Sequence, residues 1–472
     1  MKQSAKVPEP VQSLIWEDVF DKPVAVEFTA ERLTDNAGLL LPAAVDRHWG
    51  LTARIAAGLR DKRDPELIMH TMLDLLRQRT YGLLAGFADA NDAARLRKDP
   101  TFLALLGRSL EDDEELLASQ PTFSRFENAL GIGSLMRWGL ALADAVLEQQ
   151  RARRKQVRRI TLDLDPTDDA THGQQCFTFF NTHYRSWCYL PLLAFATFHD
   201  ARNREEPERY LLAALLRRGN ADATVGFAGL VRRLVRRLRA LFPETRIRVR
   251  LDGAYATPEV FALLETELRV EYVVNMGKND VLKRLVEPLL QQARLAARLS
   301  GKSERVFGEV QYSAGTWKGV TRRAVIKAEV TIDPQHPEKG MKDNPRILIT
   351  NLKSKPEHVY CEEYCPRGAM EKEIHELKND LFMDRTSCSD FKANQVRVLL
   401  AATAYVLIQE LRTQARDTAV ARWEVSHLRA RLFRCAAIVC ESTRRWVLKI
   451  SKFAPDRELW TALALRLHAA PT

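Results

Sequence analysis

Four reactive side chains spaced along one segment constrain this chain more than any other feature: Tyr364, Arg367, Glu371 and Lys378. Their spacing is Y-x2-R-x3-E-x6-K. At about 100° per residue, a helix would place all four within an arc of roughly 60°. One helix face would then carry a carboxylate between two cations and a phenol. Such a face suits a metal ion bound by the glutamate and a phosphate group bound by the two cations.

Two aspartates elsewhere in the chain come at the ends of strand-like runs. Asp165 ends the run RITLDLD and Asp252 ends the run RIRVRLD. Strand alternation puts Asp163 and Asp165 on the same face, opposite the leucines and isoleucine of the first run. Taken singly, Asp165 is explained better as a turn or helix-cap residue, and Asp252 has the corresponding explanation as a turn residue. Together with Glu371 they provide hard oxygen ligands, which suit Mg²⁺ or Mn²⁺ and the two-metal chemistry of phosphodiesters.

The overall charge points to the same class of substrate. The 472 residues carry a formal net charge of +11 and a sequence pI near 9.3, which favours binding to a phosphate polymer. The longest apolar stretches are about 11 residues, too short to span a bilayer, and the N-terminus lacks the apolar core of a signal peptide. Seven scattered cysteines without a C-x2-C pair indicate reduced thiols and a cytoplasmic protein. A zinc site from Cys361, Cys365, Cys388 and His375 matches no structural zinc spacing well.

Periodicity predicts an α/β core between two helical regions. Residues 1–150 form a helical DNA-binding region that contains the short helix of SQPTFSRFENAL. Residues 151–279 form the first part of the core, in which 207–241 is one long helix with a basic face. A β-rich insertion follows at 280–345, and the second part of the core, at 346–393, carries the Glu371 helix. Residues 394–472 are predicted to be helical throughout and to serve dimerisation.

The combined pattern resembles bacterial insertion-sequence transposases of the DDE type. It is most similar to the cut-and-paste group that has the Y-x2-R-x3-E-x6-K signature and a β insertion before the glutamate. The matching positions are Asp165 with Thr167, Asp252 with Gly253, and the four signature residues Tyr364, Arg367, Glu371 and Lys378. The segments SQPTFSRFENAL, LDLDPTDDATHGQQ and RILITNL also look like this group, so the resemblance covers nearly the whole chain.

The resemblance implies an RNase H-like catalytic core and a reaction that needs Mg²⁺, for which Mn²⁺ can substitute. A homodimer would cleave double-stranded DNA at the terminal inverted repeats of the element and join the ends to target DNA. The metal ligands and catalytic residues would be Asp165, Asp252 and Glu371. The DNA contacts near the cleaved phosphate would be Tyr364, Arg367 and Lys378. Such a protein acts on DNA in the bacterial cytoplasm, at the nucleoid, and not at a membrane.

The insertion raises a further expectation. Some relatives stack a flipped base on a tryptophan of this region, which would assign that contact to Trp317 and phosphate contacts to Arg322 and Arg323. A buried core tryptophan in a small β module explains Trp317 equally well.

Two other functions fit the same residues. An RNase H-like junction resolvase would carry similar carboxylates, and a DNA-binding protein that no longer cuts would keep the basic surface. Metal-dependent cleavage separates both enzymes from the non-cutting protein, and strand transfer separates the transposase from the resolvase.

Overall fold

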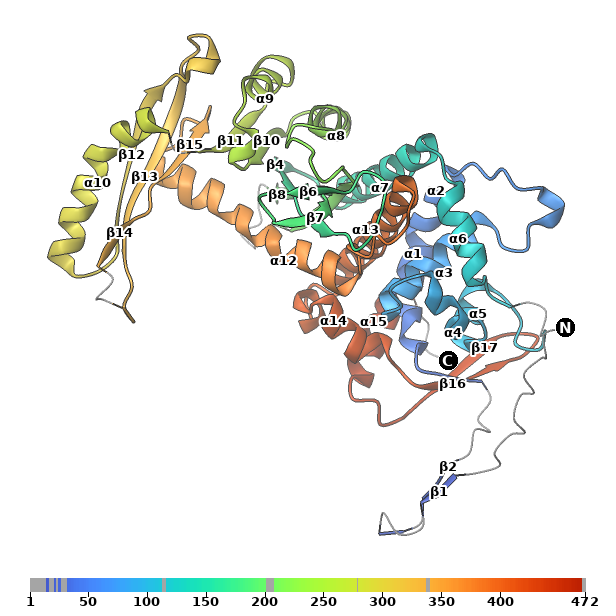
Figure 1. The fold of residues 1–472 in the computed structure, drawn as a ribbon. Helices are drawn as coiled ribbons and strands as arrows, with labels where there is room; N and C mark the ends of the chain where they lie inside the picture. Colours follow the sequence, from blue (N-terminus) through green and yellow to red (C-terminus); the bar gives the residue numbers. More distant parts are fainter. Residues whose placement is uncertain are drawn as a thin grey trace.

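A single large mixed sheet organises the middle of the chain (Figure 1). The computed structural model describes residues 14–16, 21–22, 24–26, 32–112, 116–200, 208–277, 279–336 and 340–468. Five strands form one side of this sheet, in the spatial order β9, β8, β4, β10, β11, with β9 at the edge. Their bounds are Val157–Pro166 for β4, Leu192–Asp200 for β8, Arg209–Leu215 for β9, Arg246–Leu251 for β10 and Glu271–Met276 for β11.

The direction of these strands gives the RNase H-like arrangement. β8 runs antiparallel to both β4 and β9, whereas β10 pairs in parallel with both β4 and β11. Parallel pairing needs crossover connections, and these are α8 (Phe227–Leu241) before β10 and α9 (Pro258–Ala262) before β11. Thr257 caps α9 and Pro258 takes its first position, where proline is favoured. Because β4 and β10 are parallel neighbours, their carboxyl ends lie at the same edge of the sheet.

The predicted insertion continues this sheet and does not form a separate β module. Strand β15 (Arg346–Thr350) pairs with β11, and β13 (Arg322–Ile332) then pairs with β15, β12 (Glu304–Tyr312) and β14 (Met341–Asp343). The segment opens with a 21-residue helix, α10 (Asp280–Ser300), which packs on β12 and β13. Residues 280–345 are therefore a helix followed by three strands. The helix buries one apolar face, which is formed by Leu282, Val286, Leu290, Ala293 and Ala297.

The N-terminal and C-terminal helical regions form one packed body. Helix α13 (Phe391–Gln414) is buried along almost its whole length and contacts helices from the first third of the chain. The Trp138 indole N–H donates to Thr403 Oγ1 of α13 over 3.0 Å. The helices of the N-terminal region are α1 Leu40–Trp49, α2 Leu51–Ala57, α3 Met72–Ala85, α4 Ala93–Leu96, α5 Pro100–Leu106, α6 Gln120–Ala129 and α7 Ile132–Arg153.

Two predicted helices are wrong in part. Residues 209–215, within the expected helix at 207–241, are strand β9, which pairs with β8 and has most of its side chains buried. The C-terminal region is helical in α14 (Val425–Leu428) and again in α15 (Arg457–Arg466), but β16 (Ala437–Glu441) and β17 (Trp446–Ile450) form a hairpin between them. Short apolar runs such as RYLLAAL fit a buried strand as well as a helix, and here the sheet pairing decides.

Among the described residues, three smaller sheets accompany the large one. Strand β16 also pairs with β3 (Leu33–Thr34), and β1 (Leu14–Trp16) pairs with β2 (Val24–Val26). Strands β5 (Asp169–Ala170), β7 (Ser186–Tyr189) and β6 (Phe179–Asn181) form a three-stranded sheet directly after β4 in the chain. Within the described residues, no single helix is long and apolar enough to cross a membrane; α6 and α7 pass the length and composition test only as a pair, bent by 94°.

Candidate active site

The carboxyl ends of β4 and β10 bring Asp165 and Asp252 together. Asp165 lies at the end of β4, and Asp252 follows β10 and accepts a hydrogen bond from the Ala254 backbone N–H, over 2.9 Å. Burial raises the pKa of Asp165 to about 6; Arg367 opposes this rise and the nearby Asp252 carboxylate adds to it. Two carboxylates that repel each other in a partly buried place are a site for positive charge.

The signature residues lie on an irregular helix that crosses the sheet next to these acids (Figure 1). The helix runs from α11 (Pro356–His358) through a π-helical turn at Val359–Tyr364 and a 3₁₀ turn at Cys365–Ala369. It continues as α12 (Met370–His375) and ends in a second π-helical turn at Glu376–Asp380. These changes of helical pitch alter the spacing of side chains around the axis, so the arc expected for a regular helix does not describe this segment.

Three of the four signature side chains lie close to the carboxyl ends of β4 and β10. Arg367 Nη2 donates to Asp165 Oδ1 over 2.5 Å, and Lys378 Nζ donates to Asp168 Oδ1 over 2.9 Å. Burial raises the pKa of the Tyr364 phenol, which lies close enough to Asp252 and Arg367 to feel both charges. The fourth residue, Glu371, is exposed on α12.

A buried arginine joins the three segments that carry Asp165, Asp252 and Tyr364. Arg250 Nε and Nη2 donate to both oxygens of Asp163, over 2.7 and 2.6 Å, and its Nη1 donates to the Glu363 carbonyl oxygen over 2.9 Å. Arg250 lies two residues before Asp252, Asp163 two before Asp165, and Glu363 directly before Tyr364. Asp163 is fully buried, and the Arg250 guanidinium balances its charge. Asp165 is the carboxylate that faces Arg367.

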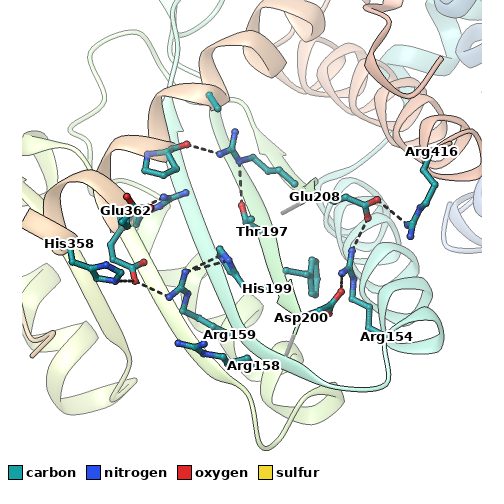
Figure 2. A pocket seen from close by; sticks show the side chains of 16 residues that line it. Arg154, Arg158, Arg159, Thr197, His199, Asp200, Glu208, His358, Glu362 and Arg416 are labelled. Carbon is teal, nitrogen blue, oxygen red and sulfur yellow. Dashed lines mark hydrogen bonds and ion pairs between the residues drawn. The ribbon is translucent and has the colours of Figure 1, made fainter. Parts of the chain in front are cut away.

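A cavity behind the signature helix is lined by arginines, and ion pairs of these arginines hold the helix on the sheet. It has a volume of ≈ 700 Å³ and includes Arg154, Arg159 and Arg416 among its walls (Figure 2). Arg154 and Arg416 both pair with Glu208, over 2.7 and 3.0 Å, and Arg159 pairs with Glu363 over 3.0 Å. Arg209 from β9 also binds Glu373 on α12 over 2.8 Å. Most of these cations are thus matched by carboxylates, and the ion pairs fix the helix on the sheet.

The residues predicted for base stacking lie elsewhere, at the junction of β13 with α9. Trp317 is 3% exposed and packs against the Phe261 and Tyr312 rings, with the Arg322 guanidinium 4.8 Å from its ring centre. Arg322 also forms two hydrogen bonds with Glu265, of 2.7 and 2.9 Å. A base can stack on Trp317 only if this corner opens.

Arg323 is held in a similar way. It donates to Glu309 Oε2 over 3.1 Å and to the Ser354 carbonyl over 2.7 Å. The DNA contacts of Trp317, Arg322 and Arg323 stay predictions.

Sequence reasoning missed Arg250 and Glu363 and left the role of Asp163 open. The signal was present in RIRVRLD, where arginines alternate with apolar residues. This strand, β10, has a neighbouring strand on each side. Cations on the inner face of a central strand need buried carboxylate partners. Asp163 was the available aspartate on the neighbouring strand.

The comparison with known protein families settles the assignment of the chain. Residues 16–472 match the transposase DDE domain group 1. The chain belongs to this family. The match confirms the predicted resemblance, and the mixed sheet of this transposase confirms the predicted α/β, RNase H-like fold class. A search of curated proteins finds no match.

The residues at the strand ends of this transposase suit the divalent metal ions that the family generally uses. Asp165 and Asp252 offer hard oxygen donors, and their mutual repulsion would be relieved by a cation. In the structure the Arg367 guanidinium supplies that positive charge to Asp165. Among the described residues, no three His, Cys, Asp or Glu side chains gather as a metal site, so Glu371 does not join the two aspartates in this arrangement.

Replacement of Asp169 tests the electrostatics next to this site. Asp169 is fully buried, accepts a hydrogen bond of 2.8 Å from Thr386 Oγ1, and has one oxygen without a partner. Burial raises its pKa to about 8 from 3.8. Between these values the folded state holds a proton that the unfolded state has lost, so this group lowers stability progressively as pH rises from 4 to 8.

Asp169→Asn removes this titration. We expect the variant to gain stability relative to the wild type with rising pH, on the order of a few kcal/mol at pH 9 and little at pH 4. Urea unfolding at the two pH values measures the difference. An equal effect of the substitution at pH 4 and pH 9 would contradict a protonated Asp169.

Proposed function

We propose that this chain is a cut-and-paste DNA transposase. It would cleave the ends of an insertion sequence in a Mg²⁺-dependent reaction, with Mn²⁺ as a substitute, and join them to target DNA. The observation that carries the proposal is the meeting of Asp165 and Asp252 at one edge of an RNase H-like sheet, beside Arg367 and Tyr364 of the signature helix.

Each residue has a role that follows from its chemistry. Asp165, Asp252 and Glu371 would hold the metal ions, with Glu371 turning in from the exposed face of α12. Bound Mg²⁺ supplies charge that stabilises the attacking and leaving oxygens of a phosphodiester. Arg367 and Lys378 carry the positive charge that would orient the phosphate, and the Tyr364 hydroxyl would donate to the DNA backbone.

The remaining regions would serve recognition and assembly. Residues 1–150 would read the terminal inverted repeats, and 394–472 would contribute to a homodimer that holds two DNA ends. The net charge of +11 supports binding to double-stranded DNA. A transposase of this kind works in the bacterial cytoplasm, on nucleoid DNA.

The test is cleavage of a labelled duplex that carries the inverted repeats flanking this gene. With Mg²⁺, the wild type should release the end and join it to a second duplex, whereas EDTA should block both steps. Glu371→Gln should reduce cleavage by at least ~10²–10³-fold, because it removes one charged ligand of the proposed metal ions. Glu357→Gln is the matched control: Glu357 is exposed near the start of the same helix and should be dispensable.

Each alternative has its own outcome. Cleavage of four-way junctions without cleavage of inverted repeats would indicate a resolvase. Tight DNA binding without any metal-dependent cleavage would indicate a DNA-binding protein that does not cut. Normal cleavage by Glu371→Gln would remove the third carboxylate from the proposed site.

A further inference from the structure

A pair of large aromatic side chains lies open to solvent on the hairpin of β6 and β7. Phe180 and Trp187 are 50% and 57% exposed and face each other directly across the two strands. Their ring centres are 6.3 Å apart, with the planes inclined by 67°. Exposed aromatic rings that adjoin one another are uncommon on a soluble surface, and they mark binding sites when they gather.

The hairpin belongs to the same corner of the molecule as the two aspartates. Its strand β7 pairs with β5, which follows Asp168 in the chain, and Asp168 binds Lys378 of the signature helix. Tyr184, in the loop between β6 and β7, lies near enough to Asp165, Asp168 and Asp252 for all three carboxylates to raise the pKa of its phenol, after the larger effect of burial. The hairpin therefore lies next to the segment after β4 that is joined to the signature helix.

Positive charge accompanies the two rings. Arg185 in the hairpin loop and Arg218, which bridges to Tyr189 of β7, are both exposed. Within the described part of the chain, neither guanidinium has a hydrogen bond or ion pair. Flat apolar faces next to unpaired cations complement a nucleotide, whose base offers a π-face and whose phosphate offers a negative charge.

We propose that Phe180 and Trp187 form a stacking platform for an unpaired base of the DNA strand whose phosphate lies at Asp165 and Asp252. The inference rests on the proposed function for the identity of the polymer. A second copy of the chain is a poorer occupant, because Arg185 and Arg218 beside the rings would meet their own counterparts. Stacking needs no particular base, so the platform would serve strand separation near the cut and not sequence reading.

The experiment uses the full-length protein and a duplex with a short single-stranded overhang that contains 2-aminopurine. Stacking on the platform should quench the 2-aminopurine fluorescence when the wild type binds. Trp187→Ala should leave the probe bright and weaken binding of the overhang about 5- to 150-fold, with little change for a blunt duplex. Trp187→Phe keeps an aromatic face and should retain most of the quenching.

Leu299→Ala is the control, since Leu299 is a large apolar residue that is 81% exposed near the end of α10, outside the hairpin. It should behave as the wild type. If the wild type binds and cleaves DNA but Trp187→Ala quenches the probe equally well, the platform is wrong while the transposase function stands. A change in oligomeric state of Trp187→Ala without DNA would also overturn the proposal, in favour of a subunit interface. Failure of the wild type to bind any DNA would overturn both proposals.

Discussion

Asp252→Asn is expected to abolish DNA cleavage, with a loss of at least ~10³-fold in single-turnover rate, while fold and DNA binding are kept. The amide conserves the volume of the side chain, and its carbonyl oxygen still accepts the hydrogen bond that Asp252 takes from the Ala254 N–H. The substitution removes only the negative charge next to Asp165. Loss of one hydrogen-bond donor in an active site costs ~10²–10³ in rate, and loss of a charged metal ligand should exceed that.

The control for this experiment is Asp222→Asn. Asp222 is an exposed aspartate whose carboxylate caps the backbone as that of Asp252 does, accepting from the Thr224 N–H over 2.9 Å, but it has no assigned part in the chemistry. Fluorescence anisotropy with labelled duplex should give similar DNA affinities for both variants and the wild type. Residual cleavage by Asp252→Asn above a few per cent of the wild-type rate would exclude Asp252 as a metal ligand.

The fold and the family follow from local sequence patterns, because those patterns are short-range. Alternation in RITLDLD and RIRVRLD predicts two strands that end in aspartate, and the structure confirms both strands. Capping by Thr257 and the following proline predicts the start of α9. The spacing of the signature residues, combined with these aspartates, predicts the family that residues 16–472 match.

What the sequence does not show depends on contacts between distant segments. Asp163 and Asp165 share one strand face, and only the arrival of Arg250, 87 residues later, distinguishes the neutralised carboxylate from the open one. The strand at 209–215 has no periodicity of its own and owes its conformation to pairing with β8. The exposure of Trp187 and the burial of Trp317 likewise result from tertiary packing, and the sequence pattern points only to Trp317.

Arg250→Met should be among the most destabilising single changes in the sheet, lowering the free energy of unfolding by ~3–5 kcal/mol. Methionine fills a similar volume but leaves the buried Asp163 carboxylate without its two hydrogen bonds and the Glu363 carbonyl without its donor. Arg209, whose Nε lies 3.7 Å from Asp163, provides weaker compensation. Urea unfolding measures the loss, and Arg232→Met is the control, because water screens the exposed Arg232–Glu267 pair and its loss should change stability little.

A second change separates charge from packing at the same place. Asp163→Asn removes the stranded charge, so the double variant Asp163→Asn/Arg250→Met should regain a large part of the stability that Arg250→Met loses. Cleavage should not recover with it, because Arg250 also joins β10 to the signature helix through the Glu363 carbonyl. Restored stability with restored cleavage would mean that the arginine only balances a buried charge. Restored stability without cleavage would show that Arg250 also keeps Asp165, Asp252 and Arg367 in their relative positions. These residues lie on three segments far apart in the chain, and Arg250 is the rigid connection among them.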